Sequence, residues 1–183
     1  MSGLFRFLRV VLTARRRGAV GPLDECVLTF RVMPADLDIN LHMNNGRYLQ
    51  VMDLGRFDYI IRVGVFGQTR RRRWMPLVGS ETIRFRRSLA PFRTYQLHTR
   101  LVHWDDKWFF FEQRFTARGE LIASAMVKGL LRGPGGNVSP VEVLAAGGHA
   151  MAAPPPPPPP GLVAWTEADA AFFEGARARG PST

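Results

Sequence analysis

The first third of the chain contains a β-like segment, a polar loop and one long apolar segment. Residues 26–33 are rich in β-branched and aromatic side chains, which predicts a strand. Pro34 should end this strand, because proline has no N–H to donate to a neighbouring strand. Residues 45–63 are apolar on most faces, a pattern typical of a buried helix. We therefore predict one long helix that the rest of the domain surrounds.

The predicted helix has a capping residue and internal charge pairs. Asn44 or Asn45 is a suitable N-cap, because a short polar side chain can accept a hydrogen bond from the first turn. Two acid–base pairs have helical spacing and are expected to stabilise the helix: Asp53 with Arg56, and Asp58 with Arg62. Residues 68–74, with four consecutive arginines, are expected to form a solvated loop, the alternative being a patch that faces phosphate groups.

The second half of the chain alternates polar and apolar residues with a period of two. This pattern predicts four strands: residues 78–89, 94–104, 108–117 and 121–132. In the second of them we expect Leu101 and His103 on the same side. The connections are short turns, which favours an antiparallel meander. A short helix should follow at 139–144, with Ser139 as its cap and Pro140 in its first position.

The two ends of the chain differ in composition from the middle. We expect four regions: a basic amphipathic N-terminal segment at 1–21, a domain at 22–145, an Ala/Gly/Pro linker at 146–161 and a tail with a short helix at 162–183. Prolines 154–160 should form a stiff polyproline rod outside the core. The tail helix is expected over 165–179, with Thr166 and Asp169 as a capping box.

The order of elements predicts the fold class. A strand, a loop, a long buried helix and four antiparallel strands are accommodated by an α+β fold in which one curved antiparallel sheet wraps around the helix. The curved sheet gives the apolar helix a concave surface against which to bury.

Net charge and cysteine content narrow the classes of partner and compartment. A formal charge of +10 and a pI near 11.2 favour an anionic partner: nucleic acid, acidic lipid or a phosphorylated small molecule. Cys26 is the only cysteine, so neither an intramolecular disulfide nor a cysteine metal cage can form. We expect a reducing, cytoplasmic location, and the scattered histidines predict no metal site and no cofactor.

The N-terminal segment carries arginines inside an apolar run. Arg6 and Arg9 argue against a signal-peptide core and against a membrane span. Two interpretations stay open: a helix that packs on the domain, which we favour, and a basic helix at residues 1–17 that makes peripheral contact with an anionic membrane.

The loop at 33–48 concentrates polar side chains between the first strand and the long helix. Together with two later segments it resembles the hotdog-fold thioesterases of the 4-hydroxybenzoyl-CoA thioesterase type, and most closely the thioesterase-superfamily-member-six-like proteins. The matching segments are His42-Met43-Asn44-Asn45-Gly46-Arg47-Tyr48-Leu49, Phe85-Arg86-Arg87-Ser88-Leu89 and Trp104-Asp105-Asp106-Lys107. The resemblance covers roughly residues 24 to 145 and implies a hotdog fold.

The resemblance also implies an activity and candidate catalytic residues. In the 4-hydroxybenzoyl-CoA enzymes the catalytic aspartate corresponds to Asp38, and in plant acyl-carrier-protein thioesterases a similar loop contributes residues that correspond to Asp38, Asn40 and His42. The implied partner is acyl-CoA or a related thioester. The implied assembly is a homodimer or homotetramer with its sites between subunits.

Thioester hydrolysis needs a nucleophile and stabilisation of negative charge on the carbonyl oxygen. We expect Asp38 to activate water or to attack the thioester, with Asn40 and His42 orienting the water. The remaining candidates would bind substrate. The backbone N–H groups of Asn45, Gly46 and Arg47 would polarise the carbonyl, and Glu81 would be a second carboxylate. The path of the coenzyme A phosphates would be lined by Arg70–Arg73, Arg84, Arg86 and Arg87.

Each candidate also has a structural interpretation. Asp36 and Asp38 can form Asx turns, Asn44 and Asn45 can be caps, His42 can be a hydrogen-bonding group under the helix, and Glu81 can be a surface charge. The main alternative function is a non-catalytic hotdog protein that binds an acyl chain or acyl-CoA, perhaps at a membrane. No nucleic-acid-binding motif accompanies the arginines, so we do not expect a nucleic-acid partner.

Overall fold

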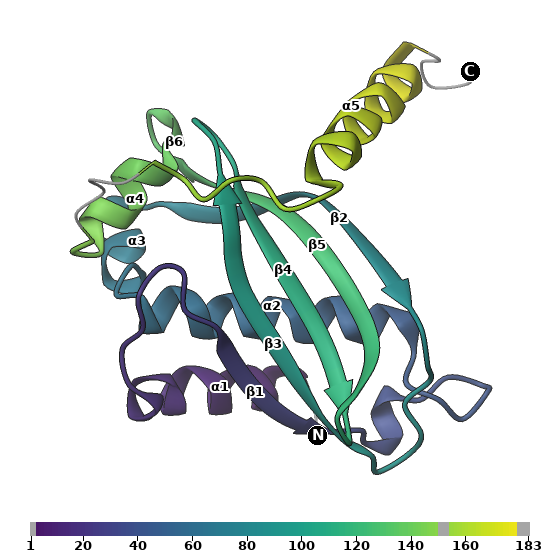
Figure 1. The fold of residues 1–183 in the computed structure, drawn as a ribbon. Coiled ribbons are helices and arrows are strands. Elements are labelled where there is room, and N and C mark those ends of the chain that lie inside the picture. The colour runs from purple at the N-terminus through teal and green to yellow at the C-terminus, as the bar shows by residue number, and fades with distance from the viewer. Residues whose placement is uncertain (1–2, 150–153, 179–183) are drawn as a thin grey trace.

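The computed structural model describes residues 3–149 and 154–178, which form a curved sheet around a long helix (Figure 1). The sheet has six strands, all paired antiparallel, in the order β1-β3-β4-β5-β2, with β6 paired to β5. The strands are β1 (Cys26–Arg31), β2 (Met75–Phe85), β3 (Thr94–Trp104), β4 (Phe109–Ala117), β5 (Glu120–Gly133) and β6 (Gly136–Val138). The predicted α+β architecture, a curved antiparallel sheet around one long helix, is confirmed.

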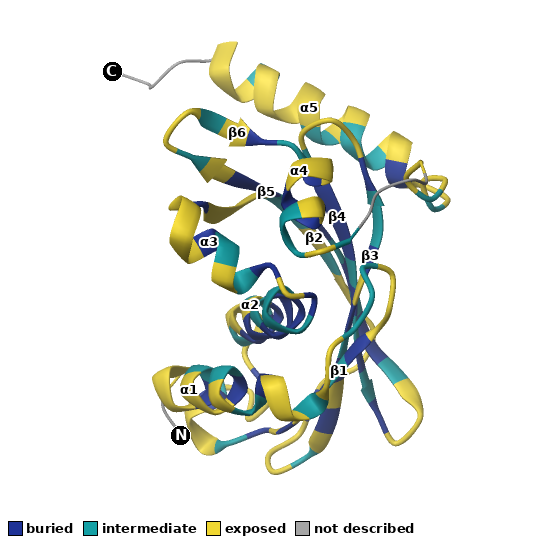
Figure 2. Cartoon of the chain, turned by 90° about the vertical axis from the view of Figure 1, so that its left-hand side faces the viewer, coloured by how far each residue is buried: buried dark blue, intermediate teal, exposed yellow. Residues whose placement is uncertain are grey.

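The central helix α2 (Asn45–Arg62) packs on the concave face of the sheet (Figure 2). Asn44 is its N-cap: the side chain accepts a hydrogen bond from the Gly46 N–H at 2.8 Å. Gly55 lies directly on the sheet, where a Cβ would come within 2.4 Å of Thr99 Oγ1. The helix therefore approaches β3 at a point where no side chain larger than a hydrogen fits.

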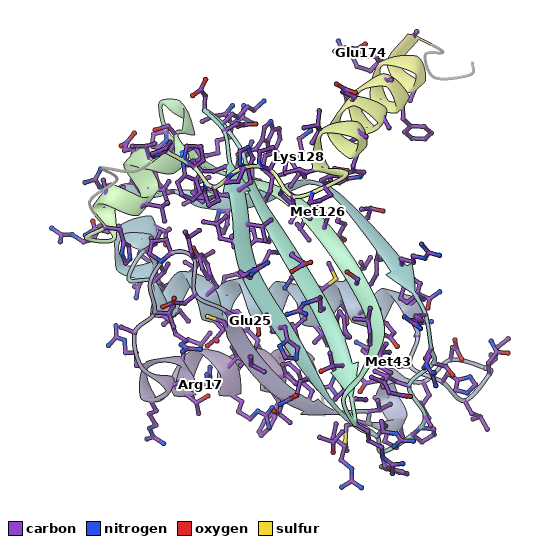
Figure 3. All side chains as sticks on the ribbon, in the orientation of Figure 1. Arg17, Glu25, Met43, Met126, Lys128 and Glu174 are labelled. Atoms are coloured by element: carbon purple, nitrogen blue, oxygen red, sulfur yellow. The ribbon has the colours of Figure 1, made fainter. Side chains whose placement is uncertain are left out.

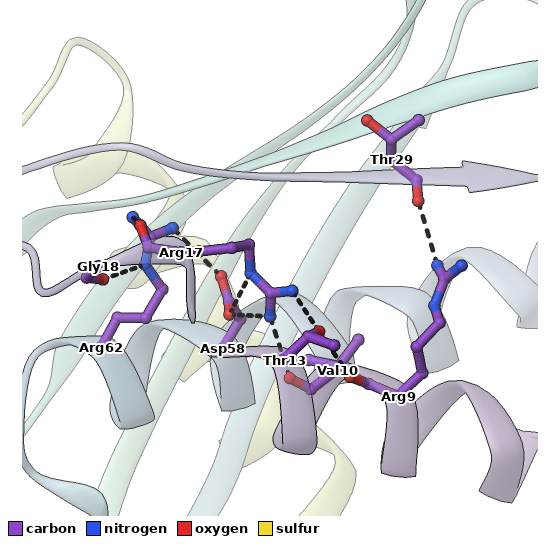
Figure 4. Close-up of polar contacts among 8 residues, drawn as sticks. All are labelled: Arg9, Val10, Thr13, Arg17, Gly18, Thr29, Asp58 and Arg62. Carbon is purple, nitrogen blue, oxygen red and sulfur yellow. Dashed lines mark hydrogen bonds and ion pairs between the residues drawn. The ribbon is translucent and has the colours of Figure 1, made fainter. Parts of the chain in front are cut away.

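The N-terminal helix α1 (Gly3–Ala14) and the 3₁₀ turn η1 (Arg15–Arg17) pack along α2. Asp58 of α2 is fully buried and pairs with Arg17 at 2.6 Å and with Arg62 at 3.5 Å (Figure 4). Phe7 meets Phe57 edge-on, with ring centroids 5.1 Å apart. Of the two interpretations of this segment, packing on the domain is the one observed. None of the helices in the described part of the chain has the length and apolarity to cross a bilayer.

Two predictions around the arginine run are wrong. Residues 66–72 form a helix, α3 (Phe66–Arg72), in place of the expected loop, because arginine is a good helix former and Thr69 is buried beneath it. Strand β2 begins at Met75, three residues earlier than predicted, and includes Pro76. Proline is tolerated there because β2 is an edge strand, whose outer side needs no ladder donor. The short strand β6, within a glycine-rich turn, was not predicted.

Strand β3 contains an irregularity that changes which side its last residues face. The pairing with β4 shifts register between Leu101 and His103, so that Leu101 faces α2 and His103 faces the opposite, convex side. The prediction that both lie on one side is therefore wrong: an extra residue inverts the alternation. On the convex side, His103 Nδ1 lies 2.7 Å from the carbonyl oxygen of Pro156.

The C-terminal tail lies on the convex face of the sheet. After α4 (Pro140–Ala146), capped by Ser139 as predicted, residues 154–161 lack regular structure and lead into α5 (Leu162–Ala178). The predicted capping box is wrong, since Thr166 donates to the carbonyl of Val163 and Asp169 accepts from Ser80 Oγ and Lys128 Nζ. Residue 179 of the predicted helix and residues 150–153 of the predicted linker lie outside the described residues.

Candidate active site

The polar loop forms a short projecting hairpin, which we call the tongue (residues 37–43). Leu37 and Met43 are bridge partners, and the Asp38 N–H donates to the His42 carbonyl at 2.9 Å. At the tip, Leu41 has a left-handed φ of 56° and its N–H donates to the Asp38 carbonyl. Ile39 is 97% exposed, so the tip extends away from the core of this chain.

One carboxylate oxygen of Asp38 accepts a hydrogen bond within the tongue, and the other can accept one from a ligand. Its Oδ1 accepts the Asn40 N–H at 2.9 Å, which is the Asx turn expected as the structural interpretation. Oδ2 has no hydrogen-bond partner among the described residues. Asn40 and His42 lie on the same tongue with exposed side chains, and no hydrogen bond in the described part of the chain joins these side chains to Asp38. His42 contributes its carbonyl, and not its ring, to the hairpin.

The start of α2 offers fewer free amides than expected. The Gly46 N–H is taken by the Asn44 side chain, and the Arg47 N–H donates to the Asn44 carbonyl at 2.9 Å. Only the Asn45 N–H has no acceptor among the described residues. The Arg47 guanidinium is also occupied, because it donates to Gln50 and to the carbonyl of Ala35. Of the three predicted amides, Asn45 is therefore the one available to a ligand.

Asp36 holds the tongue in place and faces away from solvent. Its carboxylate receives two hydrogen bonds from Arg6, one of them 2.9 Å long, and a third from the Met33 N–H at 2.8 Å. Its carbonyl accepts the Asn44 N–H at 2.8 Å. The ion pair with Arg6 joins residues 30 positions apart, and no local pattern in the sequence signals it.

A polar network that includes Glu81 lies between α2 and the sheet. Arg56 pairs with Asp53, as helical spacing predicted, and donates to Gln113 Oε1 at 2.6 Å. Gln113 in turn donates to Thr99 Oγ1 and to a backbone carbonyl of α2. Glu81 Oε2 is buried 4.0 Å from Arg56 Nη2 and has no hydrogen-bond partner in the part of the chain that the structure describes. Burial raises the pKa of Glu81, and the positive charge of Arg56 offsets this effect only in part.

An apolar cavity of about 120 Å³ adjoins this network. Asp53 and Arg56 are the charged residues in its wall, and apolar side chains from α2, the sheet and α4 line the rest, among them Ile60, Leu77, Phe111, Leu131 and Leu144. Asp53 lies about 12 Å along the helix axis from Asn45. The cavity is therefore separated from the tongue by roughly half of α2.

The arginines that were expected to line a coenzyme A path lie in separate parts of the structure. Arg84 pairs with Ser124 of β5 on the convex face, opposite to the side that Glu81 and α2 occupy. Arg70 to Arg73 lie beyond the C-terminal end of α2. Arg86 lies just after the end of β2, next to Arg87, and both N–H groups donate to the Ile122 carbonyl. Only Arg86 and Arg87 of this predicted group lie at the tongue end of the sheet.

The Cys26 thiol is buried and is not a candidate nucleophile. Burial raises the pKa of the Cys26 thiol to about 11, which leaves it protonated at neutral pH. Across residues 3–149 and 154–178, no three His, Cys, Asp or Glu side chains come together in a metal-binding arrangement.

Comparisons with known proteins give one consistent result. The family model described as thioesterase-like superfamily matches residues 32–166. The chain is 40% identical over 119 residues to Protein THEM6 of Danio rerio, an alignment that covers 63% of this chain and 59% of the relative. The chain thus spans about six-tenths of the length of this curated relative.

Solved structures share the fold. A gentisyl-coenzyme A thioesterase superposes with a TM-score of 0.59 and 22% identity, over 68% of this chain and all of the other. A 4-hydroxybenzoyl CoA thioesterase mutant, solved with 4-hydroxybenzoyl CoA, superposes with a TM-score of 0.60 and 15% identity. The superposition covers 67% of this chain and 97% of the other. These likenesses confirm the predicted α+β hotdog fold.

Proposed function

Because this chain belongs to the thioesterase-like superfamily, we propose that it is an acyl-CoA thioesterase whose catalytic carboxylate is Asp38. The observation that carries the proposal is that the family match includes the tongue, which leads into α2 and on which one carboxylate oxygen of Asp38 has no hydrogen-bond partner among the described residues. The Asn45 N–H there has no other acceptor among the described residues, and the helix dipole favours negative charge at this end.

The proposed reaction uses Asp38 first as a base and then as an acid. Its carboxylate takes a proton from water while the water oxygen attacks the thioester carbonyl carbon. The Asn45 N–H stabilises the resulting oxyanion, and Asn40 and His42 orient the water. When the C–S bond breaks, the thiol takes its proton from Asp38 and a carboxylic acid is released. Direct attack by Asp38 would give an anhydride that water then hydrolyses to the same products.

The test is a panel of acyl-CoA substrates of increasing chain length, with wild-type protein and Asp38→Asn. The asparagine can still accept the Asn40 N–H, so the tongue keeps its turn while the base is lost. We expect the rate to fall by about 10² to 10⁴. Asp106→Asn, an exposed aspartate in the β3–β4 turn, is the matched control. Full activity in Asp38→Asn would exclude the proposed role.

A second copy of the chain is proposed to complete the site. Strand β2 is an edge strand, and apolar side chains along it are exposed, with Met75 at 63% and Val78 at 46%. Natural proteins rarely leave such an edge unpaired. We propose that two copies join through β2 into a homodimer, or a homotetramer built from such dimers.

This assembly can be tested with a charge on the edge. Val78→Lys should convert the wild-type oligomer to a monomer in light scattering and reduce its activity. Val141→Lys, at a similarly exposed position on α4, should change neither. A wild-type protein that is fully active as a monomer would contradict the assembly.

The apolar cavity favours a second candidate function, the binding of an acyl chain or acyl-CoA without hydrolysis. The lining of this cavity, apolar except near Asp53 and Arg56, is of the kind that binds an acyl chain. This alternative predicts saturable binding of acyl-CoA together with no turnover of any member of the panel. The same panel therefore decides between the two functions.

A peripheral membrane contact through residues 1–17 is proposed from the outer side of α1. Leu4, Leu8 and Leu12 are exposed on this helix, and Arg15 and Arg16 follow them. Arg6 pairs with Asp36 and Arg17 pairs with Asp58 of α2, so these two guanidinium groups are not available to lipid. The double variant Leu8→Ser/Leu12→Ser should float less with anionic liposomes than wild type, and equal flotation would exclude the contact. A cytoplasmic location stays a prediction.

A further inference from the structure

Four arginines from two separate connections, the β2–β3 loop and the β4–β5 turn, meet at the tongue end of the sheet. Arg86 and Arg87 follow β2, Arg93 precedes β3, and Arg118 lies in the β4–β5 turn. Together with Ser88 they line an open hollow of about 570 Å³, which we call the arginine cleft. No local pattern in the sequence signals the whole group, because Arg118 is distant in the chain from the three arginines of the β2–β3 loop.

The positive charge of the arginine cleft is largely uncompensated. Glu120 is the carboxylate in its lining, and it pairs with Arg87 at 3.3 Å. Arg86, Arg93 and Arg118 have no acidic partner among the described residues. Guanidinium groups brought together in this way repel one another, and an anion that accepts several hydrogen bonds relieves the repulsion. Phosphate, with its geometry matched to arginine, is such an anion.

The backbone holds the arginines in place. The N–H groups of Arg86 and Arg87 converge on the Ile122 carbonyl at 2.8 and 3.1 Å. Arg118 has a left-handed φ of 53°, fixed by the tight turn between two paired strands. The Arg93 carbonyl accepts the Val32 N–H at 2.9 Å. The loops that present the four side chains are thus tied to the sheet.

An exposed aromatic ring adjoins the arginine cleft. Phe92 is 52% exposed, and Arg31 covers one side of its ring, with Cζ 5.5 Å from the centroid. Phe92 lines a second hollow, whose wall includes Arg93 and Arg118 of the arginine cleft. A ring beside a group of arginines is the combination that binds nucleotides, in which the base stacks on the ring and the phosphates meet the guanidinium groups.

The arginine cleft adjoins the tongue directly. Met43, labelled in Figure 3, lies at the base of the tongue. Its N–H donates at 3.0 Å to the carbonyl of Leu89, which lines the cleft. We propose that the arginine cleft binds the phosphorylated adenosine diphosphate half of coenzyme A, with Phe92 beneath the adenine. The assignment to coenzyme A rests on the proposed thioesterase function. The extended pantetheine arm would then lead from the cleft toward Asp38.

The test measures binding of coenzyme A and of 3′-dephospho-coenzyme A by calorimetry, which needs no turnover. In Arg93→Ala/Arg118→Ala we expect the Kd for coenzyme A to rise at least tenfold. The matched control is Arg132→Ala/Arg177→Ala, two exposed arginines outside the cleft, for which we expect less than a twofold change. An unchanged Kd in the cleft variant overturns the proposal. Because binding is read without hydrolysis, this result is independent of whether the protein proves to be a thioesterase.

Two further sets of variants separate recognition of coenzyme A from a loss of folding or of charge alone. Arg93→Lys/Arg118→Lys keeps the charge and should restore part of the affinity, and thermal melting of each variant shows whether it is folded. Phe92→Leu should weaken coenzyme A binding about fivefold or more but leave inorganic diphosphate binding unchanged. If the cleft variant instead loses binding to anionic vesicles and keeps its affinity for coenzyme A, the cleft is a lipid site and the proposal is wrong.

Discussion

Arg6 of α1 and Asp36 at the base of the tongue form an ion pair with side chains that are only 5% and 2% exposed. Arg6 Nη1 and Nη2 each contact one carboxylate oxygen, and Nη2 also donates to the Arg31 carbonyl at 3.1 Å. Since Asp36 also fixes the backbone at Met33 and Asn44, the first helix is connected through one pair to both ends of the polar loop.

Arg6→Met should lower the free energy of unfolding by about 3 to 5 kcal/mol, because it leaves a buried carboxylate without its partner. Urea denaturation measures the change. The double variant Arg6→Met/Asp36→Asn should lose less free energy of unfolding than the two single variants lose together, because it leaves no unpaired buried charge. Exposed Arg16→Met is the control, and a change in Arg6→Met as small as in that control would contradict a buried pair.

Gly55→Ala should destabilise the domain by about 1 to 3 kcal/mol or more, because the new Cβ would meet Thr99 Oγ1 at 2.4 Å and Leu97 Cδ2 at 2.7 Å. The measurement is again urea denaturation. Gly175→Ala, in α5, has open space around the added methyl group and should be neutral or slightly stabilising. Equal stability of the two variants would mean that α2 does not contact the sheet at Gly55.

Glu81→Gln should stabilise the protein at neutral pH and have a smaller effect in acid. The folded state raises the pKa of Glu81, so the folded protein holds its proton more tightly than the unfolded chain does. Stability from this residue is therefore present at low pH and is lost as pH rises through the folded pKa. Melting curves of both proteins across pH ~4 to ~8 should diverge as the pH increases. Parallel curves would show that Glu81 is not buried beside Arg56.

Asp169→Ala should free the C-terminal tail. It removes the hydrogen bond from Ser80 and the ion pair with Lys128, and these two contacts lower the pKa of Asp169. Limited proteolysis should cut within 154–178 faster in this variant, while melting of the sheet is unchanged. The same contacts should weaken as pH falls through the lowered pKa of Asp169. Glu167→Ala, on the exposed side of α5, should be cut at the wild-type rate.

Local patterns in the sequence were sufficient to predict the central elements of the fold. The period of two in β3 up to Leu101, and the apolar stretch capped by Asn44, indicate their elements without reference to distant residues. The pairs of Asp53 with Arg56 and Asp58 with Arg62 were predictable for the same reason, since a helix places residues three and four apart side by side. The polar loop was recognised by its composition and its likeness to a family.

What the sequence did not predict depends on contacts between distant residues. Arg6 lies 30 positions from Asp36, and Arg56 lies 57 positions from Gln113. The arginine cleft exists only because the β2–β3 loop and the β4–β5 turn lie side by side at one end of the sheet. Conversely, Arg84 was predicted to line the coenzyme A path but points to the convex face, since neighbours in a strand alternate in direction.

The shift in register between Leu101 and His103 has a consequence for the whole C-terminal region. With strict alternation, His103 would point among the apolar side chains around α2, and the carbonyl of Pro156 would lose its imidazole partner. One additional residue in the middle of a strand therefore helps to decide where a segment far along the chain is attached. Related chains that lack this residue are expected to carry their C-terminal extensions elsewhere, even where the remaining strands superpose.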